Sequence, residues 1–130
     1  MREILFRGKR VDNNEWVYGF LSKSRGNNHF LSLCIDHEEN GVMLSSIVEP
    51  ETIGQYTGLC DKNGVKIFEG DIVRYGDTIH EVVFEQRNGT AYFGLVYSKI
   101  ETLPFGHYQD LKQIEVIGNI YDNSEFTKGE

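Results

Sequence analysis

The stretch Gln55–Tyr75, QYTGLCDKNGVKIFEGDIVRY, decides the fold of this chain. Its centre, Asp61–Gly64, predicts a tight reverse turn. Glycine adopts the positive φ that such turns need, and an aspartate carboxylate accepts hydrogen bonds from nearby backbone N–H groups. Glu69–Asp71 predicts a second reversal, and the segments Val65–Phe68 and Ile72–Tyr75 predict strands. A glycine beside an aspartate suits the sharp corner of a small β-barrel, so we interpret the acidic residues here as structural, not catalytic.

The rest of the chain also reads as short strands separated by turn residues. Alternating or apolar segments predict strands over 3–11, 15–21, 29–35, 42–48, 79–85, 90–97 and 114–121. Gly8 is interpreted as a bulge in the first strand. The Asn88-Gly89 pair is a strong hairpin signal. We expect the last strand to pair beside the Gln55–Tyr75 stretch, to close the barrel and to be crowded at Gly118. Residues 107–113 predict one or two helical turns, and no longer helix is expected.

Length and composition indicate one compact globular unit. A chain of 130 residues is the size of a single domain. Pro50 marks a break between two parts. The prediction is an N-terminal β-subdomain over residues 1–54 packed on an SH3-like barrel over residues 55–122, with a frayed tail over residues 123–130. The expected fold class is therefore all-β: an SH3-type small β-barrel with an additional N-terminal β-layer, many short antiparallel strands and little helix.

The net charge and the number of cysteines limit which partners and which cellular compartment are expected. The net charge is −7, and a repelling net field disfavours non-specific binding to nucleic acid. Cys34 and Cys60 are too few for a disulfide framework, which favours reduced thiols in the cytoplasm. Met1–Phe6 reads as a strand and not as a signal peptide, and no apolar run approaches the roughly 20 residues of a membrane span. No membrane partner is expected.

Motifs for catalysis or cofactor binding are weak. No glycine-rich phosphate loop or nucleophile motif is present. The best metal candidate, Cys34 with Asp36–Glu39 and Cys60, has unsuitable spacing, because adjacent residues of a strand point apart. Thiol catalysis needs a histidine beside the cysteine, and the four histidines, at positions 29, 37, 80 and 107, are scattered. We expect no metal, no cofactor and no enzymatic activity, with an uncharacterised enzyme as the third alternative.

A set of basic and aromatic residues suggests a second kind of function. Mixtures of this kind hold single-stranded nucleic acid by stacking bases on aromatic rings over a positive groove. The candidate contacts are Arg7, Lys9, Arg10, Trp16, Arg74 and Tyr75. The alternative interpretation of Trp16 is a core residue, because aromatic side chains supply large burial. A salt titration against single-stranded DNA or RNA separates a nucleic-acid-binding barrel from a protein-binding module.

Four blocks of the sequence together resemble a known family. They are GLCDKNGVKIFEGDIV at 58–73, and the segments 2–19, 48–55 and 116–123. The combination resembles the YopX-like proteins, which are encoded largely by bacteriophages and prophages. The matching signature residues, interpreted as structural, are Gly58, Asp61, Gly64, Glu69, Gly70, Asp71, Gly118 and Asn119. Ser124 departs from the proline expected there. The resemblance implies an all-β chain with an SH3-type barrel and no agreed activity.

The leading hypothesis is a non-enzymatic protein-interaction module, a phage accessory protein that contacts an unidentified host or phage protein in the bacterial cytoplasm. Small barrels present sheet edges and loops as contact surfaces, and an edge strand can accept a partner's strand. The segments 22–28, 36–41 and 98–108 are the predicted loops of contact. Homo-oligomerisation through an edge strand is a related possibility.

Overall fold

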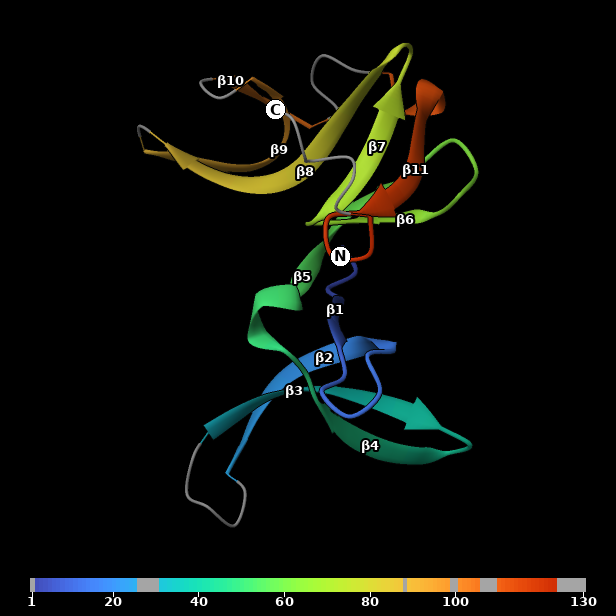
Figure 1. Ribbon diagram of the computed structural model, residues 1–130, viewed down its shortest axis with the longest axis vertical. Helices are drawn as coiled ribbons and strands as arrows, with labels where there is room; N and C mark the ends of the chain where they lie inside the picture. Colours follow the sequence, from blue (N-terminus) through green and yellow to red (C-terminus); the bar gives the residue numbers. More distant parts are fainter. Residues whose placement is uncertain (1, 26–30, 88, 99–100, 106–109, 124–130) are drawn as a thin grey trace. The chain divides into compact units, whose positions relative to one another are not determined.

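The computed structural model describes residues 2–25, 31–87, 89–98, 101–105 and 110–123, and their regular structure is almost entirely β (Figure 1). The strands are β1 (Phe6–Lys9), β2 (Trp16–Arg25), β3 (Leu31–Glu39), β4 (Val42–Ile47), β5 (Gly54–Cys60), β6 (Lys66–Phe68), β7 (Asp71–Tyr75), β8 (Thr78–Arg87), β9 (Thr90–Ser98), β10 (Glu101–Pro104) and β11 (Ile114–Asn119). Two single-turn 3-10 helices are η1 (Pro50–Thr52) and η2 (Leu111–Gln113). The all-β prediction is confirmed, and no helix in the described ranges has the length and apolarity to cross a membrane.

The chain divides into two compact units, residues 1–56 (unit 1) and residues 57–130 (unit 2). In unit 1 the strand order is β4-β3-β2-β1, followed by the start of β5, and neighbouring strands are antiparallel. The alternation predicted for β2 places Val17 inward, where it packs with Ile35 and Val48, and Phe6 and Ile53 pack against this cluster. Unit 1 thus has a small core on one face of its sheet.

The central hairpin of unit 1 is longer than the sequence analysis predicted. Residues 22–25 continue β2 and residues 36–39 continue β3, so the predicted polar loop and charged turn are wrong for these residues. Residues 22–25 pair with residues 31–34 of β3, and residues 36–39 pair with residues 42–45 of β4, which gives their backbone groups partners despite polar side chains. The turn between β3 and β4 shrinks to Asn40-Gly41, both at positive φ. Residues 26–28 lie outside the described residues.

Two glycines in unit 1 allow close approach of the chain. The predicted bulge at Gly8 is wrong, because the register of β1 with β2 runs evenly through it. Instead, a Cβ at Gly8 would lie 3.0 Å from the side chain of Val48. A Cβ at Gly19 would lie 2.0 Å from the carbonyl oxygen of Asp36, a distance that no side chain tolerates. Packing therefore requires a glycine at position 19 and leaves little room for a side chain at Gly8.

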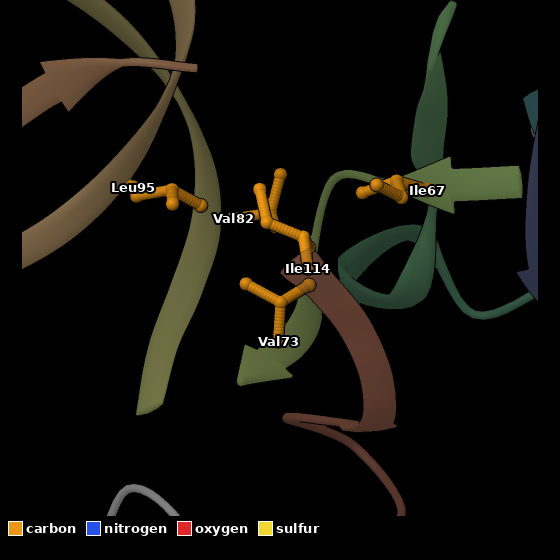
Figure 2. Packing of buried hydrophobic residues seen from close by; sticks show 5 residues of the cluster. All are labelled: Ile67, Val73, Val82, Leu95 and Ile114. Atoms are coloured by element: carbon orange, nitrogen blue, oxygen red, sulfur yellow. The ribbon is translucent and has the colours of Figure 1, made fainter. Parts of the chain in front are cut away.

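Unit 2 contains an antiparallel sheet of order β10-β9-β8-β7-β11 and the strand β6, which pairs with the end of β5. Its core consists of fully buried aliphatic side chains, one from each of five strands (Figure 2). These residues are Ile67, Val73, Val82, Leu95 and Ile114. The predicted hairpin is confirmed by the pairing of β8 with β9, with Arg87 opposite Thr90, and Gly89 has φ +80°, whereas residue 88 lies outside the described residues. The last strand, β11, pairs with β7, which lies within the Gln55–Tyr75 stretch.

The structure shows no closed barrel in the described part of unit 2. β10 and β11 end the five-stranded sheet, and β6 pairs with β5 instead of joining these edges. The expectation that the last strand closes the barrel is therefore wrong, and the SH3-type assignment stays a prediction. β10 was not predicted, and the predicted helical turns reduce to η2, with residues 107–109 outside the described residues. Of the frayed tail predicted over residues 123–130, only Asn123 is described, and its N–H donates to the carbonyl of Asn119, at 2.9 Å, so Asn123 belongs to a bonded turn. Ser124 lies outside the described residues.

We predict that Gly19→Ala lowers the free energy of unfolding of unit 1 by about 3 kcal/mol, because the new methyl group overpacks against the backbone of β3. The single tryptophan, Trp16, lies on the same strand, so its fluorescence during urea unfolding reports on this unit. Gly41→Ala is the control. Its Cβ would meet open space, and only the left-handed backbone (φ +81°) costs about 1 kcal/mol. Equal losses in the two variants would contradict the packing argument.

Candidate functional site

The Asp61 carboxylate organises the first turn of the signature. Its Oδ1 accepts hydrogen bonds from the backbone N–H groups of Asn63 and Val65, at 2.8 and 2.9 Å. Its Oδ2 accepts from the N–H of Val116 in β11, at 2.9 Å. The N–H of Asp61 also donates to the carbonyl of Val65, at 2.8 Å, and Gly64 in this turn has φ +81°. The side chain thus closes its own turn and fixes that turn to β11.

The environment of Asp61 favours the ionised carboxylate. The side chain is buried, and desolvation by itself would raise its pKa. The three backbone N–H donors, together with the nearby charge of Lys62, outweigh this effect and lower the pKa. A carboxylate held in this way is a structural acceptor and lacks the raised pKa of a general acid.

The second reversal of the signature is built in the same way. Asp71 is almost completely buried, and its Oδ2 accepts from the backbone N–H of Phe68, at 2.7 Å. Gly70, at φ +93°, donates its N–H to the carbonyl of Val82 and accepts from the N–H of Ile120, at 2.8 and 2.9 Å. The corner therefore joins β6 and β7 while bonding to β8 and to the end of β11.

The closing block of the signature is a hydrogen-bonded turn after β11. The side-chain oxygen of Asn119 accepts from the N–H groups of Tyr121 and Asp122, at 2.9 and 2.8 Å. Its backbone N–H donates to the side-chain oxygen of Asn123, at 3.1 Å. A Cβ at Gly118 would lie 2.6 Å from that same oxygen. The crowding predicted at Gly118 is present, but the neighbour is a side chain of the turn and not a strand.

Four of the six predicted nucleic-acid contacts lie in unit 1. Arg7 and Lys9 in β1 stack on the ring of Trp16 in β2, with the guanidinium carbon 4.7 Å and the ammonium 5.6 Å from the ring centroid. Arg7 is only 5% exposed. Arg10 donates two hydrogen bonds to Asp12, at 2.9 and 2.7 Å. The ring of Trp16 therefore contacts cations of its own sheet, which leaves less of its face for a stacked base.

The other two predicted contacts lie in unit 2. Arg74 in β7 is opposite Glu115 in β11, with 3.7 Å between its Nη1 and the carboxylate oxygen. Tyr75 is half-buried and packs against the core of the unit. Four of the six residues thus belong to unit 1 and two belong to unit 2.

The residues considered for metal binding or thiol catalysis have other roles. Asp36 accepts from the hydroxyl groups of Ser22 and Ser45, at 2.8 and 2.5 Å, while His37 bonds to Ser46, at 2.9 Å. Burial, and next the charge of Asp36, raise the pKa of the Cys34 thiol, which disfavours the nucleophilic thiolate. No group of three potential metal ligands is present among the residues that the structure describes.

The remaining predicted candidates are distributed over the two units. Cys60 is exposed in unit 2, whereas Cys34 is buried in unit 1. The imidazole of His80 is also buried in unit 2, where it bonds to the hydroxyl of Thr78 and the carbonyl of Val96, at 2.7 and 2.9 Å. Residues 29 and 107 lie outside the described residues. The two described histidines are therefore held by bonds within their own units.

An open sheet edge at β4 is the feature that the sequence analysis did not locate. The N–H of Val48 donates to the carbonyl of Leu33, so by the alternation of an antiparallel ladder the backbones of Met43 and Ser45 face away from β3. Among the described strands, β4 has only β3 as a neighbour in the sheet. In the described parts of the chain, no hydrogen bond occupies the outward N–H and C=O groups of Met43 and Ser45. The alternating pattern predicted the strand, but which strand lies at an edge depends on long-range pairing.

These observations define a small all-β protein whose recognisable sequence blocks are structural turns. A family model described as YopX protein matches residues 5–128, and the chain belongs to this family. Two solved structures are similar over almost the whole length. Protein yopX from Bacillus subtilis has a TM-score of 0.53 and 17% identity, covering 100% of this chain and 99% of its own. Protein EF1440 from Enterococcus faecalis has a TM-score of 0.50 and 23% identity, covering 98% and 100%. No curated protein matches.

We predict that Asp61→Asn lowers the free energy of unfolding by about 2–3 kcal/mol. Both carboxylate oxygens of Asp61 accept hydrogen bonds from backbone N–H groups, but an asparagine side chain has only one acceptor oxygen. Its NH₂ group would therefore face a backbone N–H that is left without an acceptor. Urea unfolding followed by circular dichroism measures the change. Asp110→Asn is the matched control, because Asp110 is exposed and accepts one bond, from the N–H of Lys112. A loss within about 0.5 kcal/mol of the control would show that the three bonds to Asp61 contribute little.

The lowered pKa of Asp61 also predicts how stability depends on pH. Its folded pKa lies below the unfolded value of about 3.9, so the ionised group contributes stability above pH of about 4. This contribution disappears as the pH falls through the folded pKa. Unfolding measured between pH 7 and 2 should therefore show the wild type losing its advantage over Asp61→Asn below pH of about 4. An advantage that persists unchanged at pH 2 would contradict this assignment.

Proposed function

We propose that this YopX-family protein is a non-enzymatic interaction module that binds an extended segment of a partner protein along β4. The observation that carries the proposal is the open edge of this strand, where the backbones of Met43 and Ser45 face outward. Each of these residues offers one N–H and one C=O, the groups that a partner strand pairs with in β-addition. A strand edge left in this state is a template for pairing, and many proteins protect such edges with charged side chains or proline.

The side chains of β4 support an apolar partner segment. The strand, VMLSSI, contains no charged residue and no proline. Val42 and Met43 are 57% and 61% exposed, and Leu44 and Ile47 are also exposed. Apolar groups therefore flank the edge on both faces of the sheet, because successive residues of a strand point to opposite sides. The added segment should carry apolar side chains on both of its faces.

A pocket at the end of β4 supplies a place for one side chain of the partner. It has a volume of about 260 Å³ and is lined by residues of the β1–β2 turn and of β4. The lining residues are Arg10, Val11, Asp12, Ser45, Ser46 and Ile47. Val11 also donates its N–H to the carbonyl of Ile47, at 3.1 Å, which limits the open edge to the part of β4 before that residue. The pocket thus marks where the partner segment ends its pairing.

The proposed cellular location rests on the family resemblance, and the chemistry of the described sites bears on the two alternative functions, catalysis and nucleic-acid binding. The resemblance to phage-encoded proteins supports action on a host or phage protein in the bacterial cytoplasm. The bonded carboxylate of Asp61 and the raised pKa of Cys34 argue against catalysis by these groups. Binding of single-stranded nucleic acid remains the alternative proposal, and it is weakened by the cations that already cover Trp16. The SH3-type description of unit 2 is likewise a proposal, resting on the family resemblance.

The proposal predicts that peptides selected from a displayed random library bind the protein along β4. Met43→Pro removes one outward N–H without touching the pairing with β3, so it should weaken binding at least about ten-fold. Met43→Leu is the matched control, since it keeps both the N–H and the apolar side chain, and its affinity should be unchanged. Amide hydrogen exchange should show new protection at Met43 and Ser45 in the complex.

Two results would contradict this proposal. The first is a selected peptide that binds Met43→Pro as tightly as wild type, or that protects amides only in unit 2. The second is a concentration-dependent dimer of the wild type, detected by sedimentation equilibrium, that Met43→Pro abolishes. That dimer would assign the edge to a second copy of this chain.

A further inference from the structure

We propose a second site, in unit 2, that binds a phosphate group. A pocket of about 320 Å³ lies where the Asp61 turn, the end of β7 and η2 meet β11, and its size is at the lower end of small-molecule sites. The basic pocket is lined by Lys62, Arg74, Gly76, Lys112, Gln113 and Glu115. Three cations surround one carboxylate, although the chain as a whole carries a charge of −7. A local excess of positive charge in an acidic protein favours an anionic ligand.

The fold places the three cations from three separate elements. Lys62 follows the Asp61 carboxylate, and its backbone N–H donates to the carbonyl of Ile114, at 2.9 Å. Arg74 lies opposite Glu115 in the β7–β11 ladder. Lys112 lies in η2, where its backbone N–H is held by the Asp110 carboxylate, at 3.0 Å. The positions of the charges therefore follow from backbone bonds and do not require a ligand.

The donor groups of the basic pocket are available to a ligand. Glu115 lies 3.7 Å from Nη1 of Arg74 and 4.0 Å from Nζ of Lys62, both beyond hydrogen-bond length. Within the described ranges, the side chain of Arg74 makes no hydrogen bond and the ammonium of Lys112 has no ion pair. The guanidinium alone carries five N–H donors. Glu115 attracts the cations towards one point without using those donors.

The arrangement suits a phosphate group better than a carboxylate. A single arginine can bind a carboxylate through two parallel bonds, whereas a phosphate dianion accepts from several directions at once. Lysine and arginine side chains from three elements, with the Gln113 amide, supply such directions. Gly76 has no side chain to narrow the pocket, and a Cβ there would meet nothing within 4 Å. The phosphate could belong to a small phosphorylated molecule or to a nucleic-acid backbone.

The test uses the whole chain and heteronuclear NMR titrations at low salt. The probes are inorganic phosphate, pyrophosphate, a nucleoside monophosphate, a single-stranded DNA oligonucleotide and, as the comparison, acetate. We expect saturable shifts at the amides of Lys62, Gly76 and Gln113 with the phosphate probes, and at least about five-fold weaker binding of acetate. An oligonucleotide that binds much more tightly than the nucleoside monophosphate through the same amides assigns the phosphate to a nucleic-acid backbone. Similar affinities assign it to a small molecule.

Three variants make the proposal falsifiable. Arg74→Gln should weaken pyrophosphate binding at least about five-fold, because a cation is lost at the site. Arg87→Gln is the matched control, the same change at a strand arginine that lies beside Glu85 and outside the pocket, and it should leave binding unchanged. Glu115→Gln removes the only carboxylate among the described residues of the lining and should tighten binding by several-fold, a gain that misfolding cannot produce. The proposal is overturned by absence of saturable binding, by acetate binding as well as phosphate, by equal losses in both arginine variants, or by weaker binding in Glu115→Gln.

Discussion

The bonds between the Asp61 carboxylate and three backbone N–H groups are the constraint on which unit 2 depends. One of these donors, Val116, is 55 residues away in the chain, so a single side chain joins the signature turn to the last strand. Ionised acceptors make stronger hydrogen bonds than neutral ones, and burial removes competing water. The strand held in this way contributes Ile114, a fully buried member of the core, and pairs with β7. The turn, the ladder and the core therefore support one another.

Local features of the fold could be predicted from the sequence because their causes are local. The turn at Asp61–Gly64 and the hairpin at Asn88-Gly89 follow from residues that adopt or stabilise unusual backbone conformations. The alternation of residues 15–21 predicts the strand β2 but not which of its two faces is buried. The interpretation of Asp71 as a turn acceptor rests on the same reasoning, and its carboxylate indeed bonds the N–H of Phe68. In each case the interacting groups are a few residues apart.

The parts that could not be predicted depend on pairing between distant segments. Residues 22–25 and 36–39 are polar, yet they are strands, because residues 31–34 of β3 pair with the first segment and residues 42–45 of β4 pair with the second. Closure of a barrel depends on where the ends of the sheet meet, and β6 pairs with β5 instead. The open edge of β4 also depends on long-range pairing. The composition of a strand does not determine whether it lies in the centre of a sheet or at its edge. Neither the β4 edge nor the basic pocket can be located from the sequence without knowing which strands pair.

The net charge of the whole chain does not predict the charge around one binding pocket. A charge of −7 argues against non-specific attraction of nucleic acid over the whole surface, but it does not describe a pocket only a few ångströms across. At the basic pocket, Lys62, Arg74 and Lys112 outnumber the single carboxylate of Glu115. In water containing salt, charges farther than about 10 Å contribute little, so the local group decides what binds. A binding site of the opposite sign is therefore compatible with an acidic chain.

The four sequence blocks shared with the family explain why the resemblance predicts the fold better than the function. Three of their residues, Asp61, Asp71 and Asn119, use side-chain oxygens to accept hydrogen bonds from backbone N–H groups in turns. A sequence comparison that recognises these residues detects how the chain turns. The edge of β4 lies outside the four blocks, and the basic pocket combines Lys62 and Arg74 from the signature stretch with Lys112 from beyond it. Two relatives can share every structural acceptor and still differ at both surfaces, so function in this family has to be tested at the edge and the pocket themselves.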